Sequence, residues 1–219
     1  MKKAVLTIAL GSLLVAGSAM AHQAGSTIVR AGGVIVQANS TSTTKTATEI
    51  KLKVQNNAQL GLTATHMLTD NIGVELLGAT PFSHKIKAKV PALNANLGRV
   101  AIVKQLPPSL YAQYYFGNAQ SPVRPYVGAG LNYTRFYNAR SVHPLVKELN
   151  VKKHSFAPVV NAGLDVKLTD ELYFNAAAWY TRIKTTAKFK TPAVTGQSVH
   201  EVKLKLDPMV YFAGFGYKF

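Results

Sequence analysis

The sequence predicts an all-β protein, an eight-stranded antiparallel transmembrane β-barrel. Three observations predict it: an N-terminal export signal, segments of alternating apolar and polar residues, and short turns that alternate with long connections. The 219 residues include no cysteine, so no disulfide bond can stabilise the chain after export. Beyond the N-terminal segment no run of ~18 apolar residues is present, which excludes a spanning helix. A closed barrel is the other structure that satisfies its backbone hydrogen bonds in lipid.

Residues 1–21 form the predicted signal peptide and residues 22–219 the barrel domain. A basic head (1–3) precedes an apolar stretch (4–17), and Ala21 closes the small-x-small pattern that signal peptidase recognises. The apolar stretch approaches the ~17–18 residues of the shortest spanning helix, so a retained anchor is the alternative. The cleavage pattern directly after it favours removal. We expect an exported chain that becomes a multi-pass protein of the outer membrane.

Alternation is clearest at the C-terminal end of the chain. One face carries Tyr211, Ala213, Phe215, Tyr217 and Phe219, and the other carries glycine and lysine. Strict alternation with aromatic residues on one side is typical of a barrel strand whose aromatic face meets lipid. A soluble β-sandwich could contain one such strand, but here the pattern recurs along the chain. The expected strands are 27–37, 59–65, 74–78, 109–116, 126–133, 160–166, 173–180 and 211–219.

The connections between these strands are of two kinds. Three are short and rich in turn residues, at 68–71, 117–122 and 168–171. Four are expected to be long loops, at 39–48, 86–99, 138–152 and 189–198. Short turns at one end and long loops at the other, with both termini at the short end, are the arrangement of outer-membrane barrels. Eight strands enclose an interior that side chains nearly fill or that holds one small ligand, which excludes a general porin.

Several segments together resemble the outer membrane protein W family across nearly the whole mature chain. They are 56–62 (NNAQLGL), 69–81 (TDNIGVELLGATP), 106–108 (LPP), 124–134 (RPYVGAGLNYT), 178–180 (AWY), 206–208 (LDP) and 217–219 (YKF). The resemblance implies an eight-stranded barrel with a narrow apolar interior that passes small hydrophobic molecules inward. The terminal Phe219 also resembles the signal that the outer-membrane assembly machinery reads. The chain departs from the family in its lysine-rich loops and at Met209, where an aromatic residue is expected.

The residues do not form a catalytic or metal-binding pattern. The nine acidic residues are scattered, and three of them lie in short turns, where turn formation explains them. A hydrolase would need Asp, His or Ser groups that converge at one rim of the barrel. Most histidines have no second ligand at a tight spacing, and the adjacent His200 and Glu201 point to opposite faces of a strand. We therefore expect no enzyme activity, no catalytic residue, no metal ion and no cofactor.

Sequence parity points two acidic side chains, Glu75 and Asp165, into the barrel. Buried charges need partners, and Arg30 and Lys167 come from strands that run through the same lower half. We expect these four residues to form a polar plug beneath the lumen, which would close the barrel to straight-through passage. A proton or ion relay is the alternative.

The same parity points apolar and aromatic side chains into the upper lumen. They are Leu77, Tyr111, Tyr115, Tyr126 and Trp179. A ring of this kind suits an apolar guest, whereas an anion would need lysine or arginine. Trp179, the single tryptophan, could also act only by filling the core of a narrow barrel.

Proline residues predict a break in the wall between the third and fourth strands, because proline has no N–H to give to a ladder. Pro81 lies nine residues above Ile72, and Pro107 and Pro108 lie at a similar height above Phe116. At ~3.3 Å per residue and a tilt of ~40°, such a stretch rises roughly 23 Å, near the outer end of the apolar band. We expect a lateral opening for a hydrophobic solute here. A paired bulge without traffic is the alternative.

Basic residues give the chain a formal net charge of +16 and gather in or beside the long connections. Export and burial in a membrane argue against nucleic acid as the partner of this charge. The phosphates of outer-membrane lipopolysaccharide are natural partners for lysine and arginine, although solubility explains part of the excess. Two functions remain open. One is a passive conduit for small hydrophobic molecules, and the other is a structural or surface-interaction barrel whose basic loops bind lipopolysaccharide or other anionic surface ligands without transport.

Overall fold

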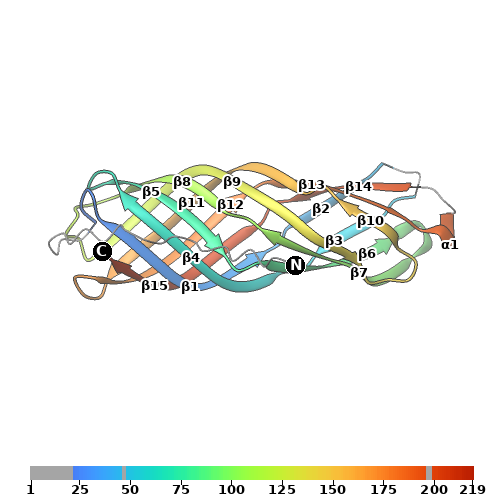
Figure 1. Ribbon diagram of the computed structural model, residues 1–219, viewed down its shortest axis with the longest axis horizontal. Coiled ribbons are helices and arrows are strands. Elements are labelled where there is room, and N and C mark those ends of the chain that lie inside the picture. Colours follow the sequence, from blue (N-terminus) through green and yellow to red (C-terminus); the bar gives the residue numbers. More distant parts are fainter. Residues whose placement is uncertain (1–21, 46–47, 196–198) are drawn as a thin grey trace, which may run out of the picture.

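The computed structural model describes residues 22–45, 48–195 and 199–219, and the predicted signal peptide lies outside these ranges. Within them eight long, tilted strands run up and down as one elongated barrel (Figure 1). Most of these long strands consist of two segments. The segments are β1 (Thr27–Gln37), β2 (Ser40–Thr44), β3 (Lys51–Val54), β4 (Asn57–Met67), β5 (Ile72–Ala79), β6 (Phe82–Val90), β7 (Ala95–Leu106), β8 (Ser109–Tyr115), β9 (Val123–Ser141), β10 (Lys147–Val151), β11 (His154–Lys167), β12 (Leu172–Thr181), β13 (Ile183–Lys190), β14 (Val199–Leu206) and β15 (Met209–Lys218).

The half of the molecule that carries the short turns is a closed antiparallel ring, which we call the lower barrel. Its strands pair in the order β1, β4, β5, β8, β9, β11, β12 and β15, and β15 pairs back onto β1. The register is continuous, with Gly32 opposite both Gly214 on β15 and Gly61 on β4. The predicted eight-stranded antiparallel barrel is therefore confirmed.

The outward face of the lower barrel is an apolar belt. Its exposed large side chains include Ile35, Leu60, Leu62, Leu76, Leu110, Leu131, Phe156, Val160, Tyr211 and Phe215. Inward neighbours are buried instead: Leu76 is 53% exposed, whereas Leu77 is 8% exposed. This period of two is what a strand shows when lipid covers one face and a packed lumen the other. No helix among the described residues has the length and apolar character needed to cross a membrane.

The other half, the upper barrel, corrects the expectation of long loops. Much of 86–99 and 138–152 continues as strand beyond the apolar belt, and so does 40–44 within 39–48. Of 189–198 only 189–190 is strand, and 192–195 forms a helical turn. Along β6 the lysines at 85, 87 and 89 are exposed, and Ile86, Ala88 and Val90 between them are buried. The alternation of the lower barrel thus continues, with lysine in place of leucine on the outside. The strands extend into water because their inner faces still bury apolar surface.

The upper barrel consists of two four-stranded arrays, β10-β13-β14-β2 and β9-β7-β6-β3. In the described part of the chain no backbone ladder joins β2 to β3. Hydroxyl groups bridge them: the side-chain oxygens of Ser40, Ser42 and Thr44 accept the N–H groups of Val54, Leu52 and Ile50 at 3.0, 2.8 and 2.9 Å. We call this line the hydroxyl seam. A helical turn at α1 (Pro192–Thr195) and a 3₁₀ turn at η1 (Pro91–Leu93) lie at the far end of the molecule (Figure 1).

Candidate functional site: a buried polar cluster and an apolar cavity

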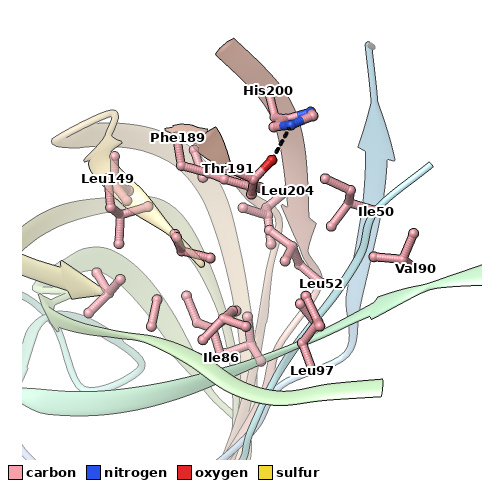
Figure 2. Close-up of a pocket in the computed structure, with 18 of the residues that line it drawn as sticks. Ile50, Leu52, Ile86, Val90, Leu97, Leu149, Phe189, Thr191, His200 and Leu204 are labelled. Carbon is pink, nitrogen blue, oxygen red and sulfur yellow. Dashed lines mark hydrogen bonds between the residues drawn. The ribbon is translucent and has the colours of Figure 1, made fainter. Parts of the chain in front are cut away.

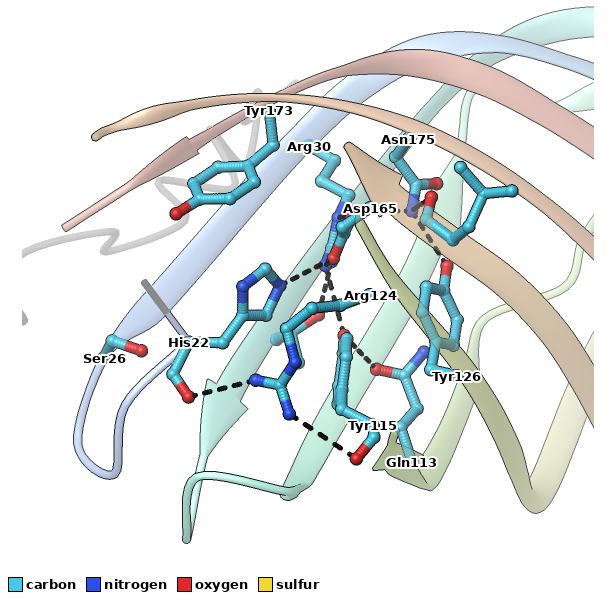
Figure 3. Close-up of polar contacts among 12 residues, drawn as sticks. His22, Ser26, Arg30, Gln113, Tyr115, Arg124, Tyr126, Asp165, Tyr173 and Asn175 are labelled. Carbon is cyan, nitrogen blue, oxygen red and sulfur yellow. Dashed lines mark hydrogen bonds and ion pairs between the residues drawn. The ribbon is translucent and has the colours of Figure 1, made fainter. Parts of the chain in front are cut away.

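A polar cluster fills the lumen near the short turns, and Arg30 of β1 is its centre (Figure 3). The Arg30 Nε atom donates to Asp165 Oδ1 at 3.0 Å, and its Nη2 also contacts Asp165. The Nη1 atom donates to Glu75 Oε2 at 2.8 Å and to Thr65 Oγ1 at 2.6 Å. All four side chains are essentially buried. One guanidinium group therefore bridges two carboxylates on opposite sides of the barrel, a planar bidentate geometry that lysine could not supply.

Aromatic and amide side chains surround this charged centre. The Tyr111 hydroxyl donates to Glu75, and Trp179 Nε1 donates to the Tyr111 oxygen at 2.8 Å. On the other side, Asn175 Nδ2 donates to Asp165 Oδ1 at 2.8 Å and to the Tyr126 hydroxyl at 2.9 Å. These bonds satisfy lone pairs of the carboxylates that would otherwise be buried without partners.

Two glycines make room for the cluster inside a narrow barrel. A Cβ atom at Gly163 would lie 2.5 Å from the Tyr126 hydroxyl oxygen, and one at Gly216 would lie 2.8 Å from Arg30 Cγ. Side chains at these positions would displace the ring or the guanidinium stem. The glycines therefore belong to the construction of the cluster as much as the charged residues do.

The chain at the start of the described residues closes the cluster from below. The His22 ring is buried, and its Nε2 atom lies 2.8 Å from Asp165 Oδ2. It packs against the rings of Tyr115 and Tyr173, each with a centroid distance of 5.0 Å. Arg124 Nη2 donates to the Asp70 carbonyl at 2.8 Å, which holds a short turn beneath the barrel. Sequence reasoning missed His22 and Arg124; the inward parity of the strand beginning near 123 was the available signal for Arg124.

Lys167 does not belong to the cluster, and its assignment to the plug was wrong. Its ammonium nitrogen lies 2.6 Å from Asp170 Oδ1 in the adjacent turn, and its side chain is 28% exposed. Lys167 is the last residue of β11, so its long side chain reaches the rim of the barrel. There the charge keeps part of its hydration, which a buried position would remove.

The assignment of Tyr111, Tyr115 and Tyr126 to an apolar cavity also needs correction. All three rings point inward and are buried, but their hydroxyl groups are bonded within the polar cluster. A buried phenol needs a hydrogen-bond partner, and the charged groups below supply it. Leu77 and Trp179 differ from them because both line a small cavity of about 40 Å³ above the cluster, here called the lower cavity.

A second apolar cavity lies higher, inside the upper barrel, and measures about 480 Å³ (Figure 2). We call it the upper cavity. Its lining is almost entirely aliphatic and aromatic, and includes Ile50, Leu52, Ile86, Val103, Phe136, Phe189 and Leu204. The sequence did not predict these residues as a site because most of them fall in segments expected to be loops. Their alternation with exposed lysines was the signal that could have revealed them.

Few polar groups line the upper cavity. The Thr191 Oγ1 and His200 Nε2 atoms lie 2.8 Å apart at its upper end (Figure 2). His84 stacks on Phe82, and its Nδ1 atom lies 3.1 Å from the Gln55 carbonyl oxygen. Burial of the His84 ring lowers its pKa below the ordinary value of 6.5, because a charged imidazolium would lose its hydration. The cavity is therefore lined by a neutral histidine at neutral pH.

This shift predicts that mild acid weakens the upper barrel. Because the folded state holds His84 with a lowered pKa, the unfolded state binds more protons as the pH falls below 6.5. The free energy of unfolding should decrease through that window by up to about 1.4 kcal/mol per pH unit. The measurement is urea unfolding in phosphatidylcholine vesicles across this range, for the wild type and for His84→Gln. A pH dependence that is the same in both would show that His84 does not cause it.

The wall between β5–β6 and β7–β8 is interrupted. The β5–β8 ladder ends at the pair Leu77 and Ser109, and the β6–β7 ladder begins at the pair Phe82 and Gln105. Between these pairs, 78–81 and 106–108 have no ladder across this wall in the described structure, and Pro81, Pro107 and Pro108 lie within these two stretches. The carbonyl groups of Pro107 and Pro108 accept Asn132 Nδ2 at 3.2 and 3.3 Å, and that of Pro108 also accepts the Tyr133 N–H at 2.9 Å.

Comparison with known proteins assigns the chain to a family. The model of the OmpW family matches residues 23–219. The chain belongs to the OmpW family. The outer membrane proteins W of Vibrio cholerae serotype O1 and of Escherichia coli K12 are each 40% identical to it over 223 residues, covering 100% of both chains. The resemblance inferred from the sequence is confirmed, and the protein is located in the outer membrane.

Solved structures of similar proteins share this OmpW fold. OprG from Pseudomonas aeruginosa is 36% identical with a TM-score of 0.83, covering 91% of this chain and 98% of that one. The solution structure of E. coli outer membrane protein W is 39% identical with a TM-score of 0.60, covering 90% and 100%. The OmpW family and its fold are those of outer-membrane barrels that are not known as enzymes.

Proposed function

We propose that the protein is a passive conduit through which small hydrophobic molecules enter the upper cavity and leave sideways into the outer membrane. The observation that carries this proposal is the 480 Å³ upper cavity, whose wall is apolar and which lies above a buried polar cluster. A pocket of this size and lining can bury most of a small apolar guest while offering it few hydrogen bonds. Hydrophobicity and size, and not a specific polar contact, would then select the solute.

The polar cluster acts as the plug of this conduit. Arg30 forms direct ion pairs with Glu75, at 2.8 Å, and with Asp165, and the rings and amides of neighbouring side chains fill the lumen around them. An apolar guest gains no favourable contact there, and separating the ions would leave buried charges without partners. Straight-through passage into the periplasm is therefore closed to such a guest.

The interrupted wall supplies the exit. The lower cavity is lined by Gly78, Ala79 and Pro107 from the interruption, and Gln105 lines both cavities. A guest that descends from the upper cavity thus meets the place where two neighbouring strands share no ladder. Widening that place breaks no backbone hydrogen bond between them, whereas any other wall of the lower barrel would lose ladder bonds of about 1 kcal/mol each.

A covalent bridge across the interruption tests this exit. Thr80 and Leu106 are both exposed and lie on opposite sides of it, so we expect Thr80→Cys with Leu106→Cys to reduce uptake strongly once a thiol cross-linker joins them. Release of the bridge by a reductant, with a cleavable cross-linker, should restore uptake. The measurement is entry of a radiolabelled aromatic hydrocarbon into cells that lack the wild-type protein and produce only the variant.

The control is a bridge across an intact wall. Ala64 and Leu76 are directly opposite on β4 and β5, so Ala64→Cys with Leu76→Cys adds a cross-link without closing the interruption. This pair should leave uptake unchanged. Unchanged uptake in both bridged proteins would overturn the lateral exit. Loss of uptake in both would show that cross-linking acts through general rigidity.

A further inference from the structure

The outer surface of the upper barrel has a groove along the hydroxyl seam, between β2 and the β3–β6 pair. Because no ladder joins β2 to β3, the surface is hollowed there into two adjoining depressions. The depression nearer the membrane is lined by Lys53, Lys85 and Lys87, and the farther one by Lys51, Lys53, Lys87 and Lys89. Asn39, Thr41, Asn56, Asn57 and Asn96 add amide and hydroxyl groups, and Asp207 adds one carboxylate to the farther depression. We call this hollow the lysine groove.

The lysines of the groove repel one another. Lys51 is directly opposite Lys89, and Lys53 is directly opposite Lys87, in the β3–β6 register. Like charges that face each other across an antiparallel pair destabilise it. Within the described chain no ion pair is found for Lys53, Lys85, Lys87 or Lys89. The acidic groups nearby are Glu49, which lies 3.6 Å from Lys51, and Asp207, which pairs with Lys205 at 3.3 Å.

The other array of the upper barrel, β10-β13-β14-β2, differs because several of its lysines form ion pairs. On β14 the carboxylate of Glu201 pairs with Lys45 at 3.0 Å and with Lys188 at 3.2 Å. Lys190 pairs with Glu148 at 2.8 Å. Part of the basic charge there is neutralised by the protein itself, although Lys184 and Lys203 have no ion pair among the described residues. The lysine groove differs in that Lys53, Lys85, Lys87 and Lys89 all line one hollow without an ion pair.

The groove begins where the apolar belt ends. Gln37 and Ala58 line its lower depression, and exposed Ile35 and Leu60 lie two residues below them on β1 and β4. Two residues of a tilted strand rise roughly 5 Å. The lowest lysines therefore lie at the level where acyl chains give way to charged headgroups, within reach of a lipid that sits against the belt.

We propose that the lysine groove binds the phosphorylated sugar headgroup of an outer-leaflet glycolipid, the lipid A part of lipopolysaccharide. Its phosphates would accept hydrogen bonds from the ammonium groups and relieve the repulsion across β3 and β6, while the sugar hydroxyls meet the amides of the groove. The acyl chains of the same molecule would lie against the apolar belt below. This site is on the outside of the barrel and does not depend on transport through the lumen.

Lipid A binding to the purified barrel in dodecyl maltoside micelles tests the proposal. We expect Lys53→Gln/Lys85→Gln/Lys87→Gln to weaken the affinity for diphosphoryl lipid A, measured by native mass spectrometry, by about tenfold or more. The triple arginine variant at the same positions should bind nearly as well as the wild type. The matched control removes as much charge from exposed positions outside the groove, with Lys152→Gln/Lys184→Gln/Lys203→Gln, and should have a much smaller effect.

Three results would overturn the proposal. Equal weakening by both glutamine triples would show attraction to the overall charge and not to the groove. Equal affinity for phosphatase-treated lipid A would show that acyl chains alone are recognised. Displacement of lipid A by inorganic phosphate at the same concentration would show that the groove is a site for a soluble anion. The heat-dependent shift of the folded barrel on an electrophoretic gel confirms folding of each variant before binding is measured.

Discussion

Arg30→Met should lower the free energy of unfolding by about 3–5 kcal/mol, because it leaves Glu75 and Asp165 buried without their common cation. The two carboxylates are each within 2.8 Å of the guanidinium, and neither is exposed. Urea unfolding in phosphatidylcholine vesicles measures the change. The matched control is Lys167→Met, which removes a lysine that the sequence had assigned to the same plug. Since that lysine is partly exposed and pairs with a turn residue, its loss should cost at most about 1 kcal/mol.

A second variant separates lost charge balance from lost packing. Arg30→Met combined with Glu75→Gln and Asp165→Asn removes all three charges but keeps side chains of similar shape. We expect it to recover most of the stability that the single variant loses, because replacing a whole buried ion cluster is often neutral. If the triple variant is as unstable as Arg30→Met alone, the cluster stabilises the barrel by packing and hydrogen bonding, and charge compensation is a minor contribution.

Leu77→Arg and Leu76→Arg should affect different properties, although the residues are adjacent. The first should reduce uptake and the second should reduce folding stability. Leu77 lines the lower cavity, so an arginine there should obstruct the proposed path and reduce hydrophobic uptake while the barrel still folds. Leu76 is in the apolar belt, roughly 10 Å above the start of β5. Arginine near the middle of the lipid face costs about 2–4 kcal/mol of folding free energy. Uptake and urea unfolding, measured on both variants, check the pair. Similar behaviour of the two variants would contradict the assigned faces.

The lower barrel was predictable from sequence because lipid imposes a strict alternation on it. Leu76 and Leu77 fall on the faces that parity assigned to them, and Arg30, Glu75 and Asp165 meet in one cluster. Parity cannot say how high along the lumen a side chain sits or where its polar end points. Tyr111 was therefore placed in an apolar ring, although its hydroxyl reaches the carboxylate of Glu75.

The upper barrel was missed for a different physical reason. Lysine on the outer face lowers the hydrophobicity of each segment, and loops were inferred from that composition. The strand persists because Ile86 and Ala88, with their counterparts on the other strands, bury an apolar inner face in a common core. The lysine-rich segments also alternate with a period of two, but their outward residues are polar because they face water and not lipid. The upper cavity follows from that core and so could not be predicted without it.

The hydroxyl seam should let the upper cavity adjust its size. The two arrays that enclose it are joined at β2 and β3 by three hydroxyl bridges, from Ser40, Ser42 and Thr44. Each bridge is worth about 1 kcal/mol and can be replaced by water at the surface. We therefore expect a bulky guest to separate the arrays by a small, graded amount, by breaking one, two or three of these bridges. The ladders within each array would stay intact. The upper size limit for a solute would be gradual, and it would be set by serine and threonine side chains that never touch the solute.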